Sequence, residues 1–226
     1  MSKKLVTLVV PTKEEIPHII NLLKSIVKSR YVKEIIVVLE VNVPNKFFKH
    51  KKVKLINQKN KGYGAAIKEG FKKSKSKYTC IYNADGSFDL NDLKKMIKLT
   101  KRYDFIFASR YLRGGGSEDD TCLTIVGNFL FTKLGLIFLN IKLSDILYTY
   151  VLCNTNLFKK FNFSNDDFRF CIELPNNVVI SNYKYTSFPS CEYKRKYGKK
   201  NVNEFRDGFL ILTEIIKCFI KKLMKI

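Results

Sequence analysis

The segment Asn83-Ala84-Asp85-Gly86-Ser87 carries the strongest chemical signal in the sequence. It directly follows an apolar run at 78–82, which we expect to be a β-strand. A carboxylate at the carboxyl end of a strand can hold Mg²⁺, which often takes its remaining ligands from substrate phosphates and water. Asp85, assisted by Ser87, is therefore a candidate metal ligand. The alternative is structural, because Asp-Gly also forms a turn that would lead into the helix expected from residue 90.

Residues 60–66, with the sequence Asn-Lys-Gly-Tyr-Gly-Ala-Ala, connect a short expected strand to an expected helix. Glycines at 62 and 64 would let the backbone approach a ligand closely, and the start of a helix favours anions. The segment is not a P-loop, because Gly-Lys-Ser/Thr does not follow at the required spacing. By itself it indicates only that a phosphate could be accommodated.

An alternation of strands and helices must position these segments. Apolar, β-branched runs predict strands, whereas apolar residues at helical spacing predict helices. The expected strands cover 5–10, 35–39, 54–56, 78–82 and 105–108, and the expected helices cover 16–27, 64–73 and 90–100. This alternation predicts a Rossmann-like α/β fold with a mostly parallel central sheet, whose ligands collect beyond the carboxyl ends of the strands.

The second half of the chain is less regular. An apolar stretch at 123–141 approaches the length of a membrane span, but Asn128, Lys133 and Asn140 interrupt it, so we expect amphipathic or buried helices instead. Residues 178–185 look like a strand. The final stretch, 203–226, predicts a basic amphipathic helix, which would lie in an anionic lipid interface or pack on the sheet with a solvated basic edge.

Composition narrows the classes of partner. The 226 residues suit one domain, and 42 Lys plus Arg against 20 Asp plus Glu give a formal net charge of +22. That excess favours an anionic partner, either nucleic acid, an acidic lipid surface or a phosphorylated substrate, unless it reflects biased nucleotide composition. Six scattered cysteines without a ligand cluster, and no apolar signal core at the N-terminus, predict reduced thiols and a cytoplasmic location.

Five short segments together resemble the family 2 glycosyltransferases. They lie at 10–15, 60–66, 83–86, 108–111 and 193–202, and the resemblance spans about 5–212. The most similar subgroup contains dolichyl-phosphate mannose synthases and bacterial polyprenyl-phosphate sugar transferases. The resemblance implies one GT-A domain, with a nucleotide-sugar half at about 1–112, an acceptor half at about 113–202 and the basic amphipathic helix at about 203–226.

The same resemblance implies an inverting hexosyltransferase. Its donor would be a nucleoside-diphosphate sugar, either GDP-mannose or a UDP-sugar, and its cofactor a divalent metal, Mg²⁺ or Mn²⁺. Its acceptor would be a polyprenyl or dolichyl phosphate, and the enzyme would sit peripherally on the cytoplasmic face of a membrane with an anionic surface. The sequence does not predict an oligomeric state.

Individual site residues follow from the resemblance. The nucleotide-sugar pocket would be lined by Pro11, Thr12, Glu15, Glu40, Asn60, Gly62, Asn83, Ala84 and Asp85. Donor or acceptor phosphates would meet Arg110, Arg195 and Lys200, and the metal would meet Asp85 and Ser87. The catalytic set would be Asp85, Asp145 and Arg195. Asp145 would serve as the base if the acceptor is a hydroxyl, although it could equally cap a helix. A lipid phosphate is already an anion and needs no strong base.

Several positions depart from the family pattern. Leu39-Glu40 replaces a pair of aspartates, and Asn83 replaces the first carboxylate of the Asp-x-Asp motif. No basic residue occurs at 118–132, where lipid-phosphate transferases often have an arginine. Transfer to a glycan or protein hydroxyl therefore stays open. The positive charge alone would suggest nucleic-acid binding, but the lysines are not gathered in a recognised binding motif, so we expect no nucleic-acid partner.

Overall fold

A seven-stranded sheet forms the centre of the molecule. The computed structural model describes residues 6–13, 16–40, 48–196 and 203–224. The strand order is β3-β2-β1-β4-β7-β5-β8, and β7 is antiparallel to its neighbours while the remaining pairs are parallel. The strands are β1 Val6–Thr12, β2 Val32–Leu39, β3 Val53–Asn57, β4 Tyr78–Ile81, β5 Phe105–Ser109, β7 Val151–Asn154 and β8 Tyr185–Pro189. The expected mostly parallel α/β sheet is confirmed.

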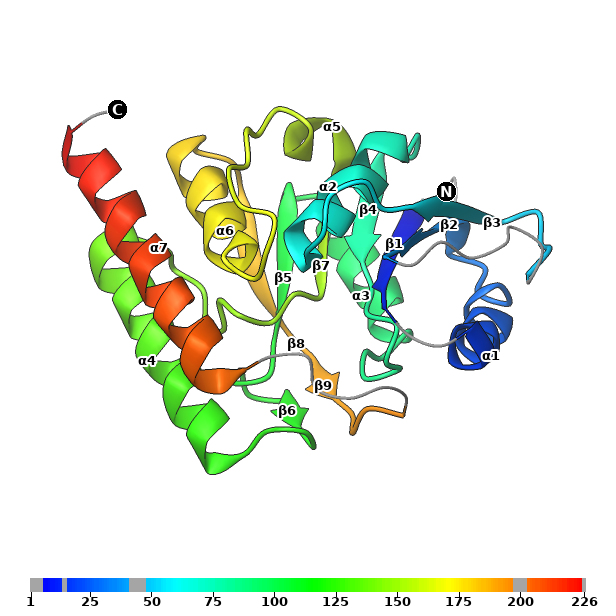
Figure 1. Cartoon of the computed structure of the whole chain (residues 1–226), viewed down its shortest axis with the longest axis horizontal. Helices are drawn as coiled ribbons and strands as arrows, with labels where there is room; N and C mark the ends of the chain where they lie inside the picture. Colours follow the sequence, from blue (N-terminus) through cyan, green and yellow to red (C-terminus); the bar gives the residue numbers. More distant parts are fainter. Residues whose placement is uncertain (1–5, 14–15, 41–47, 197–202, 225–226) are drawn as a thin grey trace.

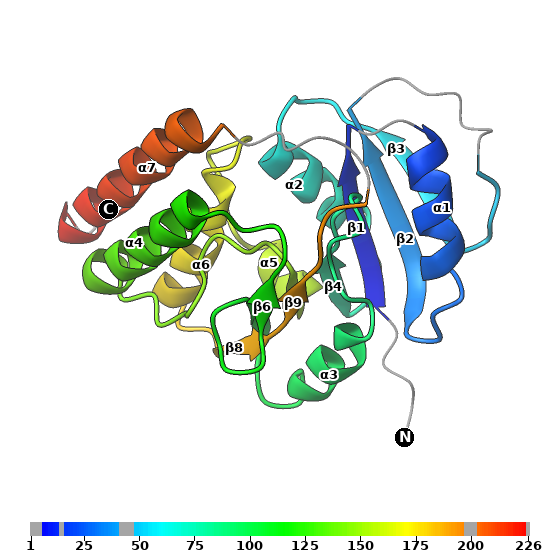
Figure 2. The same ribbon diagram turned by 90° about the horizontal axis from the view of Figure 1, so that it is seen from below.

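Helices cover both faces of this sheet. One face is covered by α1 Ile16–Ile26 and α3 Asp92–Leu99, and the other by α2 Tyr63–Lys73, α5 Thr155–Phe158 and α6 Phe170–Ile180. Figure 2 shows α1 and α2 on opposite sides of β1 and β2. In α1, Ile19, Leu23 and Ile26 recur at helical spacing and are fully buried. Each face therefore has its own apolar core.

Two long helices, α4 Cys122–Leu139 and α7 Glu204–Met224, lie side by side at the edge of the molecule farthest from α1 (Figure 1). The Phe138 and Phe219 rings meet with centroids 4.9 Å apart. The expected final helix is confirmed. The expectation of a buried or amphipathic helix at 123–141 needs correction, because α4 is apolar around its circumference yet only 17% buried. Within the described residues, α4 alone is long and apolar enough to cross a membrane, by length and composition only.

The expected strand at 178–185 is wrong. Residues up to Ile180 belong to α6, where Phe170, Leu174 and Val178 recur every four residues and are buried. Asn182 has φ 54°, a left-handed conformation that commonly ends helices, and the strand β8 starts only at Tyr185. Because α6 is surrounded by protein, its apolar residues do not follow a single stripe that would mark it as a helix in the sequence.

A small two-stranded sheet completes the fold. It pairs β6, Gly116–Ser117, in parallel with β9, Cys191–Glu192. This sheet lies near the first turns of α4 and α7, below the central sheet in Figure 1. It brings the segment before α4 next to the segment that follows β8, and both segments contribute to the pocket described next.

Candidate active site

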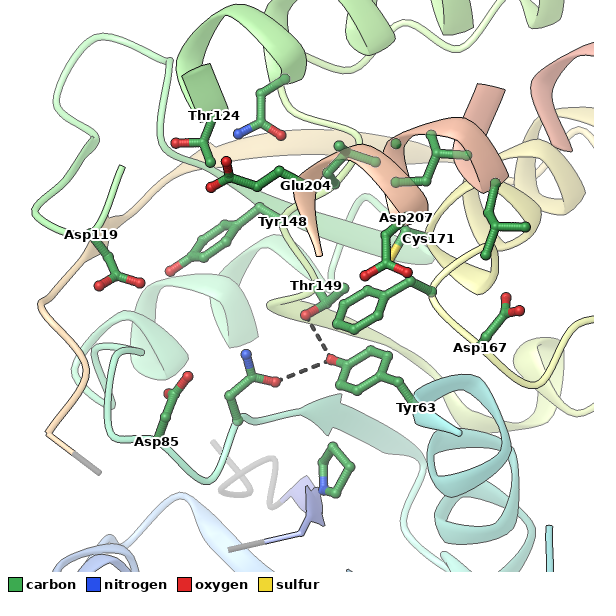
Figure 3. A pocket seen from close by; sticks show the side chains of 18 of the residues that line it. Tyr63, Asp85, Asp119, Thr124, Tyr148, Thr149, Asp167, Cys171, Glu204 and Asp207 are labelled. Atoms are coloured by element: carbon green, nitrogen blue, oxygen red, sulfur yellow. Dashed lines mark hydrogen bonds between the residues drawn. The ribbon is translucent and has the colours of Figure 1, made fainter. Parts of the chain in front are cut away.

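A pocket of about 510 Å³ opens at the carboxyl ends of the parallel strands. Its polar end is formed by residues at or just after the carboxyl ends of β1, β2, β4 and β5, together with two residues from the segments that follow β6 and β9. These are Pro11, Thr12, Lys13, Glu40, Asn83, Ala84, Asp85, Arg110, Asp119 and Arg195. The other end, which we call the apolar end, is formed by α4, α7 and the residue run before β7. Its apolar residues are Leu123, Phe131, Leu147, Phe205, Leu210 and Ile211, and the same two helices also contribute Thr124, Asn128, Glu204, Arg206 and Asp207. Figure 3 shows several of these side chains, with α4 and α7 above the ends of the strands.

Asp85 is held in place at the polar end. It follows β4 closely, and Gly86 after it adopts φ 78°, a left-handed conformation that suits glycine. The buried Ser87 donates two hydrogen bonds to Asp85 Oδ1, from its backbone N–H at 3.0 Å and from its hydroxyl at 2.7 Å. Ser87 therefore orients the carboxylate from behind and is not among the residues that line the pocket.

Asn83 is oriented by a tyrosine that the sequence analysis did not single out. The Tyr63 hydroxyl donates to Asn83 Oδ1 at 3.1 Å and also shares a 2.7 Å hydrogen bond with Thr149 Oγ1 (Figure 3). Burial raises the pKa of the Tyr63 hydroxyl, so it stays protonated and remains a donor. With Oδ1 engaged, Asn83 presents its amide nitrogen, a hydrogen-bond donor, to the pocket.

Arg110 is surrounded by carboxylates. Its Nε lies 2.8 Å from Asp145 Oδ2, and its Nη1 lies 3.0 Å from Glu192 Oε2 and 3.3 Å from Asp120 Oδ1. Burial alone would lower the pKa of the guanidinium, but Asp145 and Glu192 together raise it, so Arg110 stays charged. Burial raises the pKa of Glu192 despite the neighbouring Arg110. Arg110, which we expected to bind substrate phosphates, therefore already has three anionic partners in this structure.

Asp145 lies behind the pocket. Its side chain is fully buried, and both of its oxygens accept hydrogen bonds from Arg110. The backbone N–H groups of Arg110 and Tyr148 also donate to it, at 3.2 Å each. Asp145 does not line the pocket. In this arrangement it holds Arg110 and the Tyr148 backbone, and both of its oxygens are engaged by these groups.

Arg195 reaches the polar end from a strand-like segment that crosses the Asp85 loop. Backbone N–H groups of Tyr193 and Lys196 donate to the carbonyls of Ser87 and Asp85, both at 2.9 Å. The Arg195 guanidinium pairs with Asp119 at 2.7 Å. Segments about a hundred residues apart in the sequence thus meet beside Asp85.

The structure brings most of the expected site residues together, but not all. Nine of them line the pocket: Pro11, Thr12, Glu40, Gly62, Asn83, Ala84, Asp85, Arg110 and Arg195. Asn60 instead borders a separate, smaller depression with Lys68 and Lys72. Ser87 and Asp145 support pocket residues from behind. Glu15 and Lys200 lie outside the described residues.

The glycines at 62 and 64 serve the fold and do not open a phosphate site. A side chain at Gly62 would collide with the Asp166 carbonyl, and one at Gly64 would come within 2.9 Å of Phe170 Cβ. The Asp166 carbonyl also accepts from the Ala65 backbone N–H at 3.0 Å. The first turn of α2 is therefore occupied by the loop before α6, which corrects the expectation of close ligand approach.

Sequence reasoning missed the apolar end of the pocket and one cation in it. Leu123 and Phe131 come from α4, whereas Phe205, Arg206 and Ile211 come from α7. Both helices were expected from their composition, but no local signal indicates that their first turns face the same pocket. The exposed Arg206 of α7 is the basic residue that this end of the pocket contains, and Glu204 and Asp207 of the same helix turn also line it.

Comparisons with known proteins agree with this geometry. The model of the family described as glycosyl transferase family 2 matches residues 7–161. No curated protein sequence matches significantly. A crystal structure of glucosyl-3-phosphoglycerate synthase from Mycobacterium tuberculosis with Mn²⁺, UDP and glucosyl-3-phosphoglycerate matches with a TM-score of 0.71 and 9% identity, covering 95% of this chain and 80% of that one.

Another crystal structure of that enzyme, with Mg²⁺ and UDP, matches with a TM-score of 0.70 and 9% identity, covering 95% of this chain and 79% of the other. At this level of identity the similarity establishes the fold. The fold is that of the GT-A glycosyltransferases, as expected.

Proposed function

We propose a reaction for this chain, which belongs to glycosyl transferase family 2 and is a glycosyltransferase that uses a nucleotide-sugar donor. The chain would transfer a hexose from a nucleoside-diphosphate sugar, GDP-mannose or a UDP-sugar, to a polyprenyl or dolichyl phosphate. It would do so while bound peripherally to the cytoplasmic face of a membrane. The observation that carries this proposal is that one pocket joins a polar end at the strand tips to an apolar end between α4 and α7.

The polar end suits the donor. Asp85 Oδ1 is held by Ser87, and within the described chain no hydrogen bond reaches Oδ2. No group of three or more His, Cys, Asp or Glu side chains that could hold a metal occurs among the residues described. Mg²⁺ often binds through one or two carboxylates together with substrate phosphates, so Asp85 would hold a divalent ion jointly with the donor diphosphate. When bound, such an ion stabilises negative charge on the diphosphate.

The transfer itself is a displacement at the anomeric carbon. An oxygen of the acceptor phosphate forms a bond to C1 of the hexose, the bond from C1 to the donor diphosphate breaks, and the nucleoside diphosphate leaves with both bonding electrons. Inversion at C1 follows from attack opposite the leaving group. Arg195, beside Asp85, would compensate the charge on the departing diphosphate once that diphosphate displaces Asp119 as its partner.

The apolar end suits an isoprenoid chain. Leu123 and Phe131 of α4 and Leu210 and Ile211 of α7 line this end, and these four side chains offer no hydrogen-bonding group to a sugar acceptor. Arg206 of α7 lines the same end, and no ion pair to its guanidinium is present among the described residues. It would bind the acceptor phosphate, because a guanidinium fits phosphate oxygens well.

The state of Asp145 also supports a phosphate acceptor. Attack by a sugar hydroxyl requires a base that removes its proton, and Asp145 was the candidate. Both of its oxygens are engaged by Arg110 and by backbone N–H groups, away from the pocket. An acceptor phosphate is ionised near neutral pH and needs no such base.

The test is a transfer assay with radiolabelled UDP- and GDP-sugars, Mg²⁺ or Mn²⁺, and polyprenyl phosphate in detergent. We expect label in the organic phase from one donor, and its loss in the Asp85→Asn variant. Asp89→Asn, four residues further along and outside the pocket, is the matched control and should keep activity. Absence of organic-phase label with every donor would refute the proposed acceptor, and label on a glycan or protein would support the hydroxyl alternative.

A further inference from the structure

The most exposed large apolar side chains of this protein are concentrated on two helices. Among the described residues, seven such side chains are at least 62% exposed, and all but Ile180 lie on α4 or α7. The six are Val126, Phe129 and Ile137 of α4, and Phe205, Phe209 and Leu223 of α7. We call these six side chains the α4–α7 face. Exposure of this kind marks an interaction surface, because monomeric soluble proteins rarely leave large apolar patches uncovered.

This surface is continuous with the apolar end of the pocket. Leu123 and Phe205 line the pocket and are also 49% and 80% exposed. Both helices begin at the pocket and run away from it side by side (Figure 1). A molecule that covers the α4–α7 face would therefore also border the pocket.

The helices are attached to the domain along one side, which determines how they can meet a partner. In α4, Asn128, Gly135 and Leu139 are buried, and in α7, Ile211, Ile215 and Cys218 are buried. A membrane-crossing helix needs about 20 apolar residues in the hydrocarbon core. Because each helix keeps one side on the protein over its length, the α4–α7 face suits contact along a surface and not insertion across a bilayer.

Along α4 and the second half of α7 the charges beside the α4–α7 face are positive, whereas the first turn of α7 contains Glu204 and Asp207 together with Arg206. The helix α4 contains Lys133 and no acidic residue, and the second half of α7 contains Lys217, Lys221 and Lys222 and no acidic residue after Glu214. Lys133 lies over the Phe129 ring at 5.4 Å, and Lys222 donates to the Phe138 carbonyl. Lysines with long apolar stems can bury the stem while the ammonium reaches charged headgroups.

We infer that the α4–α7 face docks onto an anionic phospholipid bilayer and lies flat in its interfacial region, which places the apolar end of the pocket at the lipid surface. The inference deepens the proposed function and rests on it only for the identity of the lipid acceptor. Apolar side chains mixed with lysines fit such a bilayer, because anionic headgroups attract lysines near the surface. Protein interfaces, by contrast, are depleted in lysine.

Vesicle flotation tests the inference directly. The full chain is mixed with vesicles of phosphatidylcholine alone, or of phosphatidylcholine with phosphatidylglycerol, at low and high salt. We expect binding to the anionic vesicles that weakens several-fold at high salt, because salt screens surface charges. The double variant Phe129→Glu with Phe209→Glu should bind at least tenfold more weakly. Neither residue lines the pocket.

Two matched controls separate the α4–α7 face from general surface properties. Ile180→Glu changes a side chain that is 66% exposed at the end of α6 and should leave vesicle binding unchanged. Reversing Lys221 and Lys222 to Glu should weaken binding to anionic vesicles several-fold, whereas reversing Lys28, which follows α1, and Lys33, in β2, should not. If both lysine pairs weakened vesicle binding equally, only the overall charge of the protein would matter for binding. That result would overturn the inference.

A parallel measurement distinguishes this inference from the proposed function. Thermal stabilisation by UDP or GDP with Mn²⁺ should be the same in the wild type and the Phe129→Glu with Phe209→Glu variant. Nucleotide binding without vesicle binding would overturn the docking inference and the membrane location, and would leave the proposed transfer reaction standing. Vesicle binding without nucleotide binding would overturn the proposed reaction and leave the docking inference standing. A wild-type dimer in solution that the double variant dissociates would show that a second copy covers the α4–α7 face, which also overturns the inference.

Discussion

At the polar end of the pocket, Asp85 is held by Ser87 and Arg110 by three carboxylates, whereas at the apolar end Phe205 is 80% exposed and Leu123 about half exposed. The polar end has its charged groups oriented before any substrate arrives. Such preorganisation lowers the cost of stabilising charge during a reaction. The apolar end leaves its surface to be covered by another molecule. The comparison teaches that the chain itself organises the polar end, whereas the apolar end stays open to another molecule; under the proposed function these are the donor side and the acceptor side.

The largest expected effect comes from removing the cation at the centre of the polar end. Arg110→Met would leave the buried Asp145 without its partner, and breaking a buried ion pair on one side typically costs about 3–5 kcal/mol. Urea unfolding measures the loss. The double variant Arg110→Met with Asp145→Leu should recover part of it, because both charges are then gone. A loss below about 1 kcal/mol in the single variant would mean that the polar end is not held by this network.

The next effect concerns chemistry and not stability. Asp85→Asn should lower kcat/KM by about 10²–10³, the usual result of removing one group that stabilises transition-state charge. Stability should change little, because Asn can still accept a hydrogen bond from Ser87. Steady-state kinetics and urea unfolding of the same preparation separate the two quantities. An unchanged kcat/KM would mean that the donor does not bind at Asp85.

A smaller effect is expected where the two ends of the pocket meet. Arg206→Met should raise KM for the lipid phosphate about tenfold and leave KM for the donor unchanged, because hydrogen bonds to charged groups contribute about 1.5–3 kcal/mol. Arg102→Met, which alters an arginine outside the pocket, is the control. If KM rises for the donor instead, Arg206 belongs to the polar end and the division between the two ends is misplaced.

The smallest effect is a pH dependence at the polar end. The pKa of Glu192 is raised in the folded protein, chiefly by burial, so the native state holds this proton more tightly than the unfolded chain. The protonated Glu192 therefore stabilises the folded protein below the ordinary glutamate pKa of about 4.3. This stabilisation is lost as the pH rises through the raised pKa of Glu192. Glu192→Gln should therefore gain stability relative to the wild type as the pH rises above about 4.3. Urea unfolding at several pH values would show it, and a constant difference would contradict it.

Much of the first half of the fold could be predicted from sequence. Runs such as 35–39 are apolar and β-branched because they are buried on both faces of a parallel sheet, and Ile19, Leu23 and Ile26 show the spacing of one helix face. The position of Asp85 could also be predicted from the sequence, because a residue just after such a strand must lie at the carboxyl edge of the sheet. In contrast, α6 was missed since a helix surrounded by protein has no polar side to reveal its period.

The rest of the site depends on contacts between distant residues. Arg110 meets carboxylates 10, 35 and 82 positions away, and Arg195 meets Asp119 across 76 positions. The spacing of these residues along the sequence does not predict that they pair. For the same reason the sequence left Asp145 open between a base for a hydroxyl acceptor and a helix cap. Its neighbours in space are Arg110 and the Tyr148 backbone N–H, and no helix begins directly after it among the described residues.

The central claim, that the apolar end selects a lipid phosphate, is tested most directly by a competition between two phosphorylated acceptors. Labelled donor sugar and metal are given to the protein together with polyprenyl phosphate and 3-phosphoglycerate, the latter because phosphoglyceric acid is bound in one structurally similar enzyme. Organic extraction then separates the products. Our account predicts that the label enters the organic phase on the lipid. Label that stays in the aqueous phase on the small acid, with none on the lipid, would contradict it.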